Sequence, residues 1–187
     1  MSTTPSPDRP TVSDMRDLLA RTGAEIAPGL AEDEFETVEA GYGFRFAADH
    51  RLFLSVGLPL GDKWPNWRDG NARNLRTRLA WPAEGVLFDV EHNAFWPAAW
   101  GPRPAQLKHA LKSARYHLAR VPRMVPVYAH RYLPGIAGQW GHPVLSMMQT
   151  DIVVYGANLA NYIAAEFAGG SIEHAPATVP FWGDLVS

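Results

Sequence analysis

Two acids and a histidine, Asp89, Glu91 and His92, are the residues whose types are best suited to chemistry. In the segment Gly85–Val90, every second residue from Val86 to Val90 is a large apolar one, a pattern that predicts a β-strand. Side chains two positions apart on a strand share a face about 7 Å apart, a spacing suited to acid/base or metal chemistry. The other interpretation is that both acids pair with nearby arginines while His92 closes a turn.

The signatures of most enzyme classes are missing around these residues. The chain contains no Cys, which excludes thiol nucleophiles, disulfides and Cys-ligated metals. No Ser lies in a Gly-x-Ser-x-Gly turn, no glycine-rich phosphate loop occurs, and no His-Glu-x-x-His pair is present. A zinc site gathered from Asp89, His92 and His130 stays open. We expect no catalytic residue, no cofactor and no metal.

A second cluster of informative residues mixes aromatic and basic side chains in a predicted loop, 57–71. Loops carry many binding residues, and Trp and Arg are enriched among the residues that dominate interface energies. The alternative is that both Trp rings of this loop cover the core beneath it. The expected partner-binding surface consists of Trp64, Trp67, Arg68, Asp89, Glu91 and His92.

Composition predicts one globular domain. The 187 residues are 47% hydrophobic and 19% charged with a net charge of −2, which excludes a polybasic binder or a disordered polyelectrolyte. The charged residues nevertheless occur in blocks along the chain: residues 63–131 carry 12 basic and 4 acidic groups. A basic face follows only if this block stays together in space. Lys108, Lys112 and Arg115 could track phosphates, but we interpret them as a solvated helix face and expect no nucleic-acid partner.

Periodicity and breaker residues give the expected elements. Helices are predicted at 13–23, 31–40, 47–56, 73–79, 104–122 and 156–169, and strands at 85–90, 125–129, 144–148 and 152–155. We expect a disordered leader over 1–12, a domain over 13–170 and a tail over 171–187 that packs back on it. The N-terminal residues 1–14 lack the apolar run of a secretory signal, and the uncharged stretch 152–165 is too short to span a membrane, so we expect a cytoplasmic protein without a membrane partner.

Three stretches resemble the SUKH superfamily, the bacterial relatives of the fungal cell-wall-assembly regulator. They are Glu36–Phe53, Gly85–Pro102 and Pro143–Phe167, and the resemblance spans roughly residues 34–167. Its motifs are hydrophobic patterns rather than catalytic signatures. The resemblance implies a single α+β domain in which a curved, mainly antiparallel or mixed sheet packs against helices. It also implies a non-enzymatic role, most often immunity to a polymorphic toxin.

These observations favour a non-enzymatic binding protein. We expect an immunity protein that captures and neutralises a cognate toxin by direct contact, using a few aromatic and Arg anchors. One alternative is a metal-assisted hydrolase centred on Asp89, Glu91 and His92. Another is a regulatory scaffold like the fungal relative.

Overall fold

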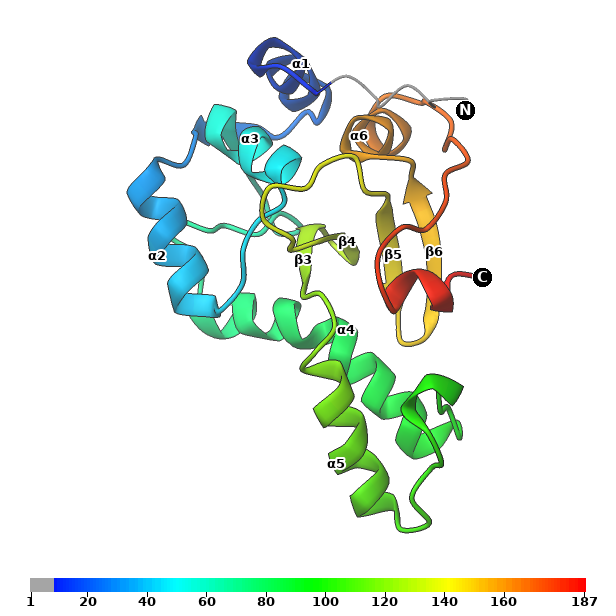
Figure 1. Cartoon of the computed structure of the whole chain (residues 1–187). Helices are drawn as coiled ribbons and strands as arrows, with labels where there is room; N and C mark the ends of the chain where they lie inside the picture. Colours follow the sequence, from blue (N-terminus) through cyan, green and yellow to red (C-terminus); the bar gives the residue numbers. More distant parts are fainter. Residues whose placement is uncertain (1–8) are drawn as a thin grey trace.

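The structure is a computed structural model that describes residues 9–187 (Figure 1). Its helices are α1 (Val12–Arg21), α2 (Glu32–Tyr42), α3 (Ala48–Val56), α4 (Ala72–His92), α5 (Leu107–Leu118) and α6 (Leu159–Phe167), with short 3-10 turns η1 (Ala98–Trp100) and η2 (Trp182–Leu185). Its strands are β1 (Glu25–Pro28), β2 (Gly57–Leu60), β3 (Met124–Tyr128), β4 (Arg131–Pro134), β5 (Val144–Met148) and β6 (Asp151–Gly156).

The strands form two antiparallel sheets. β1 pairs with β2, and the other four strands form a sheet in the order β3-β4-β5-β6. α1, α2 and α3 lie beside the small sheet, and α6 lies at one end of β5 and β6 (Figure 1). The predicted α+β class is confirmed, with two antiparallel sheets where one was expected.

Two clusters of buried apolar side chains make up the core. The first gathers residues of α1, α2, α3, β3 and α6 with Trp64 and Trp67. The second gathers the C-terminal half of α4 with α5, β5, β6 and the tail. α4 contributes to both, through Leu75 and Leu79 to the first and through Val86 and Val90 to the second.

The main correction concerns α4. The sequence predicts a short helix at 73–79 and a strand at 85–90, but one 21-residue helix covers both. Pro82 lacks the N–H that would bond the carbonyl of Arg78, and such a proline usually ends a helix. Here the Tyr132 hydroxyl from β4 donates to that carbonyl at 2.7 Å, so the free acceptor is satisfied and the helix continues.

Gly85 gave the second misleading signal in this segment. A Cβ atom at Gly85 would lie 2.8 Å from the Cα of Gln149 in the turn between β5 and β6. The glycine therefore marks a close approach of α4 to that turn rather than a break between elements.

The remaining expectations differ in smaller ways. The predicted helices at 31–40 and 47–56 correspond to α2 and α3, and both strands of the β5–β6 hairpin lie where they were predicted. α5 begins at Leu107 rather than at Pro104. β1, β2 and β4 were not predicted, because each is only four residues long and lacks a clear alternation.

The two ends of the chain differ in what the structure describes. Of the predicted leader, residues 1–8 lie outside the described residues, and α1 begins at Val12, capped by Thr11 and Asp14. At the other end the tail 171–187 lies against the domain. Trp182 is 2% exposed and donates from its indole N–H to the carbonyl of Pro122 at 2.8 Å, and Val186 bridges to Ile152 of β6.

Candidate functional site

Both tryptophans of the predicted binding surface lie in the core. Trp67 is 4% exposed, and its ring meets Phe46 edge-on with centroids 5.4 Å apart. Trp64 is 7% exposed and stacks on Phe167 of α6 at 5.5 Å. A side chain buried to this extent offers a partner almost no surface, so the expectation that these rings contact a partner is wrong for the folded chain.

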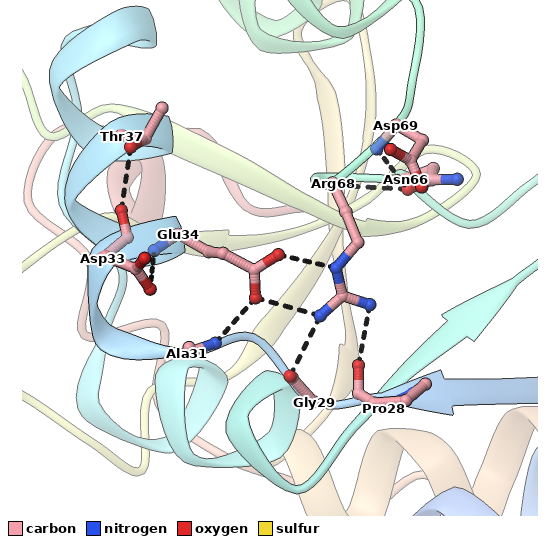
Figure 2. A network of polar contacts seen from close by, with 9 residues as sticks. All are labelled: Pro28, Gly29, Ala31, Asp33, Glu34, Thr37, Asn66, Arg68 and Asp69. Atoms are coloured by element: carbon pink, nitrogen blue, oxygen red, sulfur yellow. Dashed lines mark hydrogen bonds and ion pairs between the residues drawn. The ribbon is translucent and has the colours of Figure 1, made fainter.

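Arg68 is engaged within the protein (Figure 2). Its Nε donates to Oε1 of Glu34 at 2.6 Å and its Nη2 donates to Oε2 at 3.0 Å, and the guanidinium also donates to the carbonyls of Pro28 and Gly29. Bidentate pairs of this kind are among the stronger polar contacts in proteins. Arg68 therefore ties the loop after β2 to the segment between β1 and α2.

Glu34 shows the electrostatic result of this clamp. The hydrogen bond from Arg68, followed by one from the main-chain N–H of Ala31, lowers the pKa of Glu34 to about 2. Each bond favours the ionised carboxylate. The Glu34 carboxylate thus accepts both from the main chain at the start of α2 and from Arg68. The role of Arg68 in the fold is to hold these two segments together.

Asp89 is likewise buried and occupied. On a helix, positions two apart point about 200° away from each other, so Asp89 and Glu91 do not share a face as they would on a strand. The Asp89 carboxylate is 4% exposed and accepts from the N–H of Thr150 at 2.8 Å and from its hydroxyl at 2.7 Å. Burial raises its pKa, but the hydrogen bonds from Thr150 and Asn93 outweigh burial and hold the pKa below its usual value. Asp89 is an ionised anchor between α4 and the β5–β6 turn.

Glu91 and His92 are the two predicted residues that reach the surface. Their side chains are about half exposed, with His92 Nε2 3.8 Å from Glu91 Oε2. The His92 ring packs against Phe88, with centroids 4.4 Å apart. Within residues 9–187, no three His, Asp or Glu side chains lie close enough together to hold a metal ion.

Sequence reasoning missed three exposed apolar residues beside this pair. Trp81, Phe88 and Met148 are 43%, 45% and 46% exposed. Trp81 and Phe88 lie seven residues apart on one side of α4, and the indole N–H of Trp81 donates to the carbonyl of Met147 at 3.1 Å. The spacing would have revealed the pair had the helix been recognised. We call Trp81, Phe88 and Met148, with Glu84, Glu91 and His92, the outer α4 surface.

The surroundings of this surface are basic. The C-terminal part of α4 projects together with α5 from the rest of the molecule (Figure 1), so the basic residues of these two segments stay near each other in space. Between residues 72 and 123, Glu84 and Glu91 are the exposed acids. The exposed basic residues of the same segment are Arg73, Arg76, Arg103, Lys108, Lys112, Arg115, Arg120 and Arg123. The region therefore carries a positive field that favours an acidic partner.

Comparison with known proteins gives no relative to place beside this geometry. No family model, no curated protein and no solved structure matches the chain. Within residues 9–187, no helix is both long enough and apolar enough to cross a membrane. The resemblance to the SUKH superfamily stays a prediction.

Proposed function

We propose that this protein binds another protein and performs no bond-making chemistry, with capture of a cognate toxin in the cytoplasm as its role. The outer α4 surface carries this proposal. It places Trp, Phe and Met side chains, which are enriched in interfaces, half exposed on α4 and at the end of β5, next to the turn that packs against α4. A rigid apolar patch with charged residues at its edge is typical of a protein-binding surface.

The residues first considered for chemistry support the same proposal. Asp89 is held by Thr150 and Asn93, Glu91 lies on another side of the helix, and His92 packs on Phe88. A general base must have a free lone pair directed at a substrate. The hydrolase alternative therefore loses the acid pair on which it rested.

Capture would work by coverage. A stable complex of this kind buries about 1,200–2,000 Å² in total, and a few anchors supply most of the affinity. We assign the anchors to Trp81 and Phe88, which are half exposed, whereas Trp64 and Trp67 are buried. A partner whose active site is covered in this way is inhibited without any change to its own residues.

The test is neutralisation of, and binding to, a toxin encoded next to this protein's gene. We expect co-expression to restore growth of toxin-producing cells, and we expect Trp81→Ala and Phe88→Ala each to weaken binding of the purified toxin at least about tenfold. Tyr116→Ala, which removes a 57% exposed ring from α5, is the matched control and leaves affinity unchanged.

Two outcomes would overturn the proposal. One is turnover of a small compound by the pure protein that disappears when Glu91 or His92 is replaced. The other is unchanged affinity for the toxin in both the Trp81 and the Phe88 variants, with folding verified by thermal denaturation.

A further inference from the structure

A groove of about 380 Å³ lies between α4 and α5, next to the outer α4 surface. Its floor is apolar. The floor residues are Leu79, Pro82, Leu87, Leu118, Met124 and Trp182. Glu84 lines the groove and also belongs to the outer α4 surface, so the two features form one continuous region.

The walls of the groove are low. Ala80 and Ala83 of α4 and Ala119, which follows the last residue of α5, are small residues in its lining. Small residues let a third helix approach closely, since the distance between packed helices depends on the side chains at the contact. Glu84, Arg115, Ala119 and Arg123 are solvent-exposed, which leaves the groove open along its rim.

The rim is predominantly positive. Arg115 and Arg123 line the groove. Glu84 is the single acid among the lining residues. Within residues 9–187, neither Arg115 nor Arg123 forms an ion pair. An apolar floor between unpaired arginines is complementary to an apolar face flanked by carboxylates.

We propose that this groove receives an amphipathic helix of a partner protein, with apolar residues on one face and Glu or Asp beside them. The inference rests on the proposed function and names the chemistry that the captured protein presents. A helix laid in a groove buries one apolar stripe and leaves its polar side in water, which suits an open rim. Small-molecule sites instead enclose most of their ligand.

The first test uses two synthetic peptides of about 18 residues, long enough for five helical turns. Both carry Leu at helical i, i+3, i+4 and i+7 spacing; one has Glu and the other has Lys at the flanking positions. By fluorescence anisotropy, we expect the Glu peptide to bind at least about tenfold more tightly, with a preference that shrinks as salt screens the charges. Equal affinity of the two peptides would overturn the inference.

Variants of the groove locate the binding. Arg115→Glu combined with Arg123→Glu should reverse the preference between the two peptides, and Ala119→Trp should block both by filling the wall. Arg16→Glu makes the same kind of charge change on α1, at the opposite end of the molecule in Figure 1, and should leave affinity unchanged. If Ala119→Trp binds as tightly as the parent protein, the groove is not the site.

Other occupants of the groove give distinct results. A second copy of this chain would appear as a dimer in sedimentation that Ala119→Trp dissociates, and dodecanoate binding that Ala119→Trp abolishes would indicate a small amphiphilic acid. Either result without Glu-peptide binding overturns the inference. Toxin capture that survives Arg115→Glu/Arg123→Glu overturns the groove alone, whereas groove binding of the Glu peptide without any toxin capture overturns the proposed function alone.

Discussion

The aromatic cluster around Trp67 and the outer α4 surface contain similar types of residue but differ in burial and in the partners of their arginines. In the first, Trp67 packs against Phe44 and Phe46 in the core, and the neighbouring Arg68 is matched by Glu34 and two carbonyl groups. In the second, Trp81 and Phe88 stay half exposed, and Arg115 and Arg123 of the adjoining groove form no ion pair with any residue from 9 to 187.

The difference separates an aromatic–arginine cluster that is satisfied within the protein from one for which we propose a partner. Where internal acceptors satisfy the guanidinium, the cluster is complete and contributes to stability. Where rings face water and arginines form no ion pair within residues 9–187, the proposed partner supplies the missing contacts. Residue type alone does not distinguish the two cases.

The largest effect we expect is on stability, from Trp67→Ala. Emptying a buried tryptophan site should cost about 3–5 kcal/mol of unfolding free energy, because contacts are lost and a cavity remains. Phe88→Ala on the outer α4 surface should cost less than about 1 kcal/mol. Urea denaturation measures both, and similar losses for the two variants would break the comparison.

An effect of intermediate size on stability should come from a change in pH, through His50, which packs beside Phe46 of the aromatic cluster. Complete burial beside Phe46 lowers the pKa of His50 from 6.5 to about 3. The unfolded chain binds this proton below about pH 6.5, so the contribution of His50 to stability is full above that pH and is lost as pH falls toward 3. We expect a loss of roughly 2–3 kcal/mol between pH 6.5 and about pH 4.5.

His50→Gln is the variant that isolates this contribution. The difference in unfolding free energy between His50→Gln and the parent should shift in favour of the variant as pH falls through that window. Denaturant titrations at a series of pH values measure the shift. A difference in unfolding free energy that stays constant with pH would mean that water reaches His50, which would contradict its complete burial.

The smallest effect should come from the middle of α4, the helix that contributes to both clusters of the apolar core. Tyr132→Phe removes the donor to the Arg78 carbonyl and should cost about 1–2 kcal/mol, the usual penalty for an unsatisfied acceptor. In a Pro82→Ala background, a main-chain N–H returns at position 82 and can bond that carbonyl instead. Tyr132→Phe should then cost less, and a double-mutant cycle measures this coupling. Equal costs in both backgrounds would show that the hydroxyl does not substitute for the missing N–H.

Sequence periodicity predicted the elements whose signals are local. α2 and α3 show helical spacing with acids in the first turn, and the β5–β6 hairpin has two apolar runs around a short turn. The α+β class followed from these elements. α4 was mispredicted because Pro82 and Gly85 normally break a helix. Their presence inside one depends on contacts with Tyr132 and Gln149, which are distant in sequence.

The candidate site was predictable only in part, for the same reason. Glu91 and His92 reach the surface whether the segment is a strand or a helix, so their exposure did not depend on the error. Trp81 and Phe88 share a side only on an unbroken helix. Trp64 and Trp67 were ambiguous because a loop that lies over a core and a loop that binds a partner have the same composition.

The continuity of α4 also bears on how the protein denatures. This one helix contributes to both apolar clusters, and Tyr132 of the large sheet bonds the Arg78 carbonyl that Pro82 leaves without a main-chain partner. Neither half of the molecule can melt while this helix persists, so calorimetry should record a single cooperative transition. A partner bound to α4 would raise the melting temperature of the whole chain, including helices that the partner does not contact.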